Sequence, residues 1–369
     1  SADSFFPDNV IVYYSGLSEH MENLFKKHEQ IQQVAFYNNQ SFAKKRFFYY
    51  KPENFNMILL ALLSFEYGAI KDELFEKLNI TELSGFVITV KNPNTSWSKG
   101  KKSEEFWGAK GAIGEFLAVL NKYAKFTIAA NYENTLEFHF PTMGRLYSIK
   151  DHYGSERKLF ELLEITSYEG MLENIEITLN KGAIQTSSVP QEGEIHFNSK
   201  RLSEGEQQAI IIKGLTELLS EKNSLFLFDE PDTYLHPKWQ RQFISEIQKF
   251  ITDSYNLENS FVIATHSPQL LSNAKSELNF VKIIENGEII ENTPKHYGRE
   301  INSILYDLMG VEERNELVRN EISELYNLIA EEKIKDAESK LKDLRNLIGL
   351  DDPALKRAEI QIAYLKEDE

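Results

Sequence analysis

The chain has 369 residues, 41 % of them hydrophobic and 27 % charged, so it can bury a sizeable core, and its length suggests two or three domains of about 150 residues each. It contains no cysteine, which excludes disulfides, thiolate nucleophiles, thiolate zinc sites and iron–sulfur clusters. Its 41 basic and 57 acidic residues give a net charge of −16, so contact with nucleic acid would need a local basic patch.

The most apolar run, residues 57–65, ends at Glu66 and is too short for a membrane-spanning helix, which needs about 20 apolar residues. No signal peptide is visible, because Asp3 and Asp8 flank the short apolar pair at residues 5 and 6. We therefore expect a cytoplasmic protein with no membrane partner.

The first expected element is a buried strand at residues 9–14, where β-branched and aromatic residues are followed by Ser15 and Gly16. A chain that enters a folded element so close to its first residue is unusual. We therefore expect further residues before Ser1 in the natural protein.

Residues 17–180 predict a mixed α+β lobe, because helical and alternating patterns follow one another without a fixed order. The alternation at 126–130 and 136–140 indicates a hairpin. Helices are expected over 53–67, 70–78 and 113–124 and from 158, strands over 86–90, 175–179 and 194–197, and a loop over 91–105. The basic and aromatic residues at 44–51 would suit a nucleic-acid backbone, although charges beside a core strand are the commoner meaning of such a pattern.

The strongest chemical signal is the segment at residues 225–230, four apolar residues followed by Asp229 and Glu230. The apolar run predicts a fully buried strand of a parallel sheet, and ligands of such sheets bind beyond the carboxyl ends of the strands. An aspartate there can hold Mg²⁺, and the next carboxylate can polarise an attacking water. Taken alone, the segment is equally well explained as a strand that ends in a charged turn.

Two further signals flank this strand. Ser203 precedes a helical run and has Glu206 three residues later, which predicts a capping box, while Gly205 would permit close backbone approach. Downstream, residues 261–265 predict a second buried strand that ends at His266, which by itself would most simply be a core histidine.

The order and spacing of these signals predict one site. Residues 238–252 have a helical pattern, which gives the strand–helix–strand crossover of a parallel sheet. Glu230 and His266 would then lie at neighbouring strand ends, on one edge of one sheet.

These motifs resemble the ABC-type ATPases, specifically the soluble branch that includes RecF, SMC and OLD-like proteins. Residues 202–207 (Leu-Ser-Glu-Gly-Glu-Gln) match the signature motif, 225–230 the Walker B motif, 231–237 the D-loop of this branch, and His266 the switch histidine. More loosely, residues 295–300 and the helical pattern after Asn302 resemble bacterial anti-phage ATPases of the Septu and retron-associated type.

The resemblance implies ATP and Mg²⁺ as cofactors and a homodimer that closes head-to-tail around the nucleotides. Asp229 would bind Mg²⁺, Glu230 would be the general base, and His266 would contact the γ-phosphate. The cofactor-binding group would comprise Ser203, Gly205, Glu206 and Gln207, which complete the site of a partner subunit, and Asp232, which couples the two sites.

One required motif does not occur in the chain. A phosphate-binding Walker A loop reads Gly-x-x-x-x-Gly-Lys-Ser/Thr, whereas the only Gly-Lys pair, Gly100-Lys101, is followed by Lys102 and has Thr95 at the earlier glycine position. The loop could precede Ser1, which we favour, belong to another polypeptide, or be lost. In the favoured case this chain alone would be inactive and the full-length protein would hydrolyse ATP.

The sequence therefore predicts an α/β ABC-type ATPase head with a parallel core sheet and flanking helices, a mixed α+β lobe and a C-terminal helical cap. The expected divisions are 1–16 and 181–300 for the head, 17–180 for the lobe and 301–369 for the cap. The expected function is ATP-gated anti-phage defence, with an effector nuclease and DNA or RNA as partners. A RecF-like repair ATPase and a non-hydrolysing scaffold are the alternatives.

Overall fold

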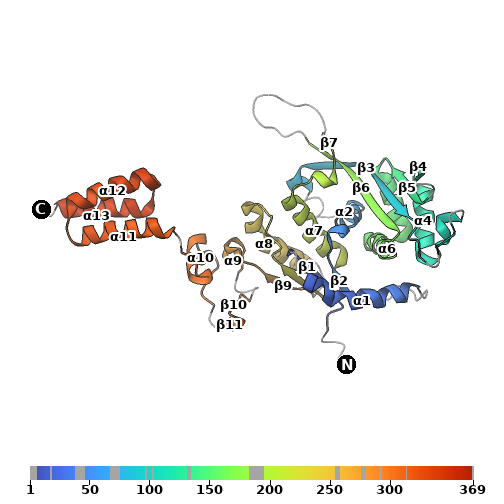
Figure 1. The fold of residues 1–369 in the computed structure, drawn as a ribbon, viewed down its shortest axis with the longest axis horizontal. Helices are drawn as coiled ribbons and strands as arrows, with labels where there is room; N and C mark the ends of the chain where they lie inside the picture. Colours follow the sequence, from blue (N-terminus) through green and yellow to red (C-terminus); the bar gives the residue numbers. More distant parts are fainter. Residues whose placement is uncertain are drawn as a thin grey trace. The chain divides into compact units, whose positions relative to one another are not determined.

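The computed structural model describes residues 6–16, 19–37, 46–66, 75–95, 98–101, 104–130, 134–182, 195–253, 258–275, 280–290, 293–312 and 314–367. These residues form two compact units, Ser1–Asn273 and Ala274–Glu369 (Figure 1). The first unit contains all of the candidate site residues. The domain divisions drawn from the sequence remain a prediction.

A four-stranded parallel sheet forms the centre of the first unit. It comprises β1 (Asn9–Tyr14), β2 (Phe47–Tyr49), β8 (Ser224–Asp229) and β9 (Ser260–Ala264), in the order β2-β1-β8-β9. Helix α8 (Pro237–Asp253) connects β8 to β9. The predicted parallel core sheet and the predicted crossover are therefore confirmed, and the crossover brings the carboxyl ends of β8 and β9 side by side.

The burial of these strands differs from the prediction. On one face, Phe226 and Phe261 stack with ring centroids 4.6 Å apart, and Phe250 of α8 covers Phe261. On the other face, Leu225 and Leu227 are only half-buried and Val262 is 58 % exposed. The expectation that both strands are fully buried is wrong, because within the described residues helices cover only one face of β8 and β9.

A second, five-stranded sheet is antiparallel and has the order β4-β5-β3-β6-β7. Its strands are β3 (Ile80–Lys91), β4 (Phe126–Ala130), β5 (Thr135–Phe140), β6 (Leu172–Lys181) and β7 (Ile195–Asn198). The predicted hairpin is confirmed as the β4–β5 pair. Two strands lie across the predicted division: β2 joins the parallel sheet, and β7, beyond residue 180, joins this antiparallel sheet.

Helix α2 (Phe55–Leu63) lies between the two sheets and explains the most apolar run of the chain (Figure 1). Every residue of α2 except Asn56 is buried, and the helix packs against α6 (Glu156–Tyr168), α7 (Glu204–Leu219) and β6. The other helices of this unit are α1 (Glu19–Tyr37), α4 (Gly111–Tyr123), α5 (Met143–Tyr153) and α9 (Pro268–Asn273), with short 3-10 turns at Pro52–Asn54, Glu105–Gly108 and Ser199–Arg201. Most of the helix expected over 70–78 lies outside the described residues.

In the basic and aromatic segment at 44–51, the described contacts favour charges beside a core strand over a nucleic-acid contact. Phe47–Tyr49 form β2, where His28 and Phe25 of α1 lie against Phe47 and Tyr49. The Lys51 ammonium lies 3.3 Å from Glu22 and 3.1 Å from Glu29. Lys44 and Lys45 lie outside the described residues. Phe47, Tyr49 and Lys51 are thus engaged in packing and ion pairs within the chain.

The second unit contains a small hairpin, β10 (Ile283–Glu285) and β11 (Glu288–Ile290), followed by α10 (Ile301–Met309). Helices α11 (Glu316–Ala330), α12 (Ile334–Ile348) and α13 (Pro353–Glu367) share a hydrophobic core around Leu325 and Leu355. The predicted C-terminal helical region is confirmed. Across the described parts of both units, none of the helices has the length and apolar character that crossing a bilayer requires.

Candidate functional site

The carboxyl ends of β8 and β9 bring the predicted catalytic side chains together. Asp229 pairs with Ala264 at the end of the ladder, and the backbone N–H of Glu230 donates to the Ala264 carbonyl over 2.9 Å. The chain then turns, and the backbone N–H of His266 donates to Oε1 of Glu230 over 3.0 Å. Two strands that are far apart in the sequence thus present a carboxylate and an imidazole at one edge.

His266 is open to solvent in this arrangement, and Glu230 is partly exposed. The imidazole Nε2 lies 3.9 Å from Oε1 of Glu230, and the side chains of His266 and Glu230 are 97 % and 28 % exposed. The backbone of Glu230 has a φ of 49°, a left-handed conformation that is uncommon for a residue with a side chain. Such a conformation persists only where the surroundings hold it, and it occurs often at functional sites.

Asp229 is half-buried at the last position of β8, and no hydrogen bond or ion pair of its carboxylate is found among the described residues. Nor do the described residues contain any cluster of three or more acidic or histidine side chains suited to a metal. One carboxylate is too few for an all-protein metal cage, but it fits Mg²⁺, which usually keeps waters and is shared with substrate phosphates.

Helix α7 begins at the predicted capping box. The Ser203 hydroxyl accepts the Glu206 backbone N–H over 3.3 Å, and the Glu206 carboxylate accepts the Ser203 backbone N–H over 2.8 Å. Lys181 Nζ lies 2.6 Å from the same carboxylate. Burial raises the pKa of Glu206, but the bonds from Lys181 and Ser203 outweigh it and hold that pKa below its ordinary value. Glu206 therefore stays ionised at the positive end of the helix dipole.

A contact within the chain explains why position 205 is a glycine, and the sequence alone does not reveal this contact. A Cβ at this position would come within 2.5 Å of the Tyr234 carbonyl oxygen, which belongs to the turn after β8. The start of α7 therefore packs directly on the backbone of Tyr234 and Leu235. The close backbone approach predicted for this glycine is found within the chain, between α7 and the turn after β8.

Asp232 and Gln207 are bonded within the chain. Asp232 is 1 % exposed, and its Oδ1 accepts the Thr265 hydroxyl over 2.9 Å. The Gln207 side chain donates to the Leu202 carbonyl over 2.8 Å. The burial of Asp232 favours a role in fixing the turn after β8 to the end of β9, rather than direct contact with a nucleotide.

Gln208 is the residue that the sequence analysis missed. It is 1 % exposed and connects three elements: Nε2 lies 3.1 Å from the Tyr13 hydroxyl and 3.2 Å from the Glu230 carbonyl oxygen, and Oε1 accepts the Tyr234 backbone N–H over 2.9 Å. The only signal in the sequence was an amide at a position of α7 that faces the core. This amide therefore joins helix α7 to β1 and to the turn after β8 that contains Glu230.

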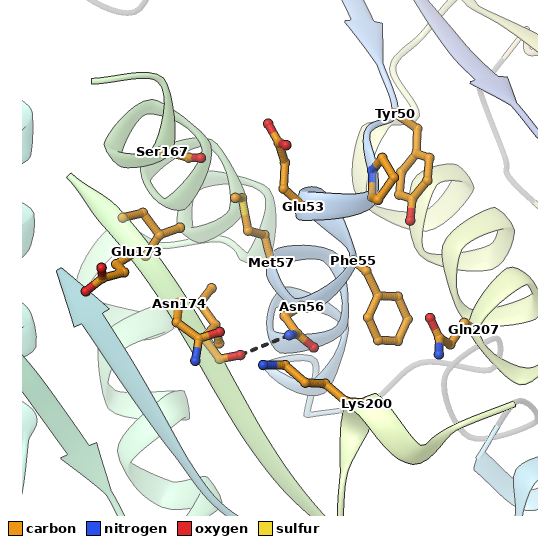
Figure 2. Close-up of a pocket in the computed structure, with 13 residues that line it drawn as sticks. Tyr50, Glu53, Phe55, Asn56, Met57, Ser167, Glu173, Asn174, Lys200 and Gln207 are labelled. Atoms are coloured by element: carbon orange, nitrogen blue, oxygen red, sulfur yellow. Dashed lines mark hydrogen bonds between the residues drawn. The ribbon is translucent and has the colours of Figure 1, made fainter. Parts of the chain in front are cut away.

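A separate pocket of about 420 Å³ lies beside the start of α2 (Figure 2). Its amide side chains are already bonded within the chain: Asn56 donates to the Ile175 carbonyl over 2.9 Å, Asn174 to Glu176 over 3.1 Å, and Gln207 to Leu202. Its charged residues, Glu53, Glu173 and Lys200, have mixed signs. With satisfied amides, and two carboxylates beside a single ammonium group, the pocket specifies no ligand class.

Residues 132–272 match the family described as "AAA domain, putative AbiEii toxin, Type IV TA system". The matched segment contains every candidate site residue. The chain is 24 % identical to the "Retron Ec83 probable ATPase" of Escherichia coli over 230 residues, which cover 58 % of this chain and 41 % of that protein. It is 30 % identical to the "Septu protein PtuA" of Bacillus thuringiensis over 194 residues, which cover 46 % of each.

These similarities confirm the resemblance to retron-associated and Septu ATPases that the motifs indicated. The chain spans less than half of the length of the two curated relatives it matches. The individual roles of the site residues remain predictions.

Proposed function

We propose, from the similarity of this chain to retron and Septu proteins, that it is the part of an ATPase that supplies the general base, one metal ligand and the switch histidine. The observation that carries this proposal is the meeting of Glu230 and His266 at adjacent strand ends, next to Asp229. A carboxylate that is partly exposed and an imidazole that is open to solvent suit a site that admits a phosphate and a water.

Each side chain has a chemical task in this proposal. Glu230 takes the proton of the attacking water, and His266 donates a hydrogen bond to a phosphate oxygen. Asp229 would hold Mg²⁺, which neutralises negative charge on the phosphates when ATP is bound. The protein's own contribution is to fix these side chains at one sheet edge before the nucleotide arrives.

We propose further that a second copy of the protein completes the site, head-to-tail, with the start of its helix α7. Ser203 caps that helix and is exposed, and a helix start carries unpaired N–H groups and partial positive charge that favour an anion. Gly205, Glu206 and Gln207 would serve this end by shaping the first turn. The result would be a homodimer with ATP between the two copies.

The biological role that fits best is ATP-gated anti-phage defence with a partner nuclease and DNA or RNA as the signal. It rests on the similarity to the retron and Septu proteins, and the alternative is a RecF-like role in repair. A nuclease that co-purifies with the native protein would support defence. Recombination factors in its place, with binding to DNA ends or gaps, would support repair.

The direct test of the enzyme is phosphate release from ATP. No Walker A motif occurs in the 369 residues, so the assay uses the natural protein expressed from its complete gene. We expect turnover with Mg²⁺ and its loss when EDTA removes the metal, because the phosphates cannot then be neutralised. A purified, folded protein that binds ATP but never releases phosphate would be a scaffold instead.

A further inference from the structure

Two side chains donate hydrogen bonds to the backbone carbonyl group of Glu230. The Gln208 amide donates to it over 3.2 Å from inside the protein, and the Thr233 hydroxyl donates to it over 3.1 Å from the surface. The same hydroxyl lies 3.4 Å from Oε2 of the Glu230 carboxylate. The backbone unit held in this way has a φ of 49°.

A left-handed conformation is energetically unfavourable for a residue with a side chain, so the chain needs an opposing restraint to keep it. The Gln208 amide supplies such a restraint, because all three of its bonds are made to fixed groups and none to solvent. Burial raises the pKa of the Tyr13 hydroxyl and the Gln208 bond lowers it, with a net rise, so Tyr13 stays neutral.

This restraint sets the orientation of the Glu230 carboxylate. If the Glu230 backbone relaxed to an ordinary negative φ, its side chain would leave the bond to the His266 N–H and swing away from the strand end. We propose that Gln208 is a positioning residue for Glu230: it fixes the left-handed turn and so aims the carboxylate, with Thr233 as the second donor. This inference rests on the proposed ATPase function.

The start of α7, which would complete the site of the partner copy, would also act on the site of its own copy. Gln208 lies in the helix that Ser203 caps, and Gly205 packs against the same turn after β8 that Gln208 bonds. A shift of the capped helix end would therefore be passed to Glu230 of the same copy through one amide group. No contact with nucleotide is required of Gln208.

The test compares Gln208→Met with Tyr13→Phe in the complete natural protein. Gln208→Met keeps the length of the side chain but removes all three bonds, and we expect kcat for ATP to fall about 10- to 100-fold, the scale of a misplaced catalytic group, with KM nearly unchanged. Tyr13→Phe removes only the bond to β1 and leaves the bond to Glu230, so kcat should change by less than about threefold.

Thr233→Val provides a second measurement that does not depend on the core, because Thr233 is exposed. We expect kcat to fall several-fold with KM unchanged. If Gln208→Met does not fold, a wild-type kcat in Thr233→Val would overturn the proposal that side-chain bonds to the Glu230 carbonyl orient the carboxylate. A Gln208→Met protein with the wild-type kcat, a change in KM alone, or an equal loss in Tyr13→Phe would overturn the positioning role while leaving the ATPase proposal intact. A wild-type protein without ATP turnover would overturn both.

Discussion

Replacing Glu230 by Gln is expected to slow ATP turnover by about two to four orders of magnitude, the scale for loss of a general base. The amide keeps the shape of the carboxylate, and its Oε1 can still accept the His266 N–H that now donates over 3.0 Å. It cannot take a proton from water. Because binding is retained while hydrolysis is blocked, the variant should also accumulate as an ATP-bound dimer, which size-exclusion chromatography with ATP would detect.

Glu258→Gln is the matched control, because Glu258 is an exposed glutamate just before β9, at the opposite end of the strand from His266. It removes the same charge from the neighbouring strand of the same sheet without touching the site. Wild-type turnover in Glu230→Gln would show that Glu230 is not the base. Equal losses in the two variants would show a general effect of charge.

Replacing Gly205 by Ala is expected to lower the free energy of unfolding by about 1–3 kcal/mol, the usual cost of overpacking, and to reduce turnover as well. The new Cβ would lie 2.5 Å from the Tyr234 carbonyl oxygen, and this backbone cannot easily yield, because the Tyr234 N–H is bonded to buried Gln208. The start of α7 or the turn after β8 must shift, and Glu230 is in that turn. Thermal unfolding and phosphate release measure the two effects.

Gly144→Ala is its control. Gly144 is the second residue of α5 as Gly205 is the second residue of α7, and a Cβ at Gly144 meets nothing within 4 Å. This substitution should be neutral or slightly stabilising, since alanine favours helix. Full stability and activity in Gly205→Ala would mean that the contact between α7 and Tyr234 is not as close as described.

The parts of the site that sequence could predict are those with local causes. A run of apolar residues ending in Asp229 and Glu230 already indicates a strand and its functional end, and Ser203 with Glu206 already specifies a helix cap. The crossover helix between β8 and β9 follows from the helical pattern of residues 238–252 and its place between two expected strands. The arrangement of Glu230 beside His266 was predictable because parallel neighbours end at the same edge.

The parts that sequence could not predict depend on contacts between distant segments. Whether Val262 is covered depends on which helices reach that face of the sheet, and an apolar run carries no such information. The need for glycine at 205 comes from Tyr234, and the importance of Gln208 from Tyr13 and Glu230. The left-handed backbone of Glu230 likewise has no local signature, since no glycine or asparagine marks it.

The most direct test of the shared-site dimer is a cross-link between two copies. These 369 residues contain no cysteine, so Glu204→Cys in one copy and His266→Cys in the other, both with Glu230→Gln, place single thiols at the helix start and at the strand end. Both native side chains are exposed, that of His266 by 97 %. We predict that mixing the two proteins gives a short-linker cross-link between copies only when ATP and Mg²⁺ are present. Efficient closure of a dimer with ATP but no such cross-link, or the same cross-link without nucleotide, would contradict the account.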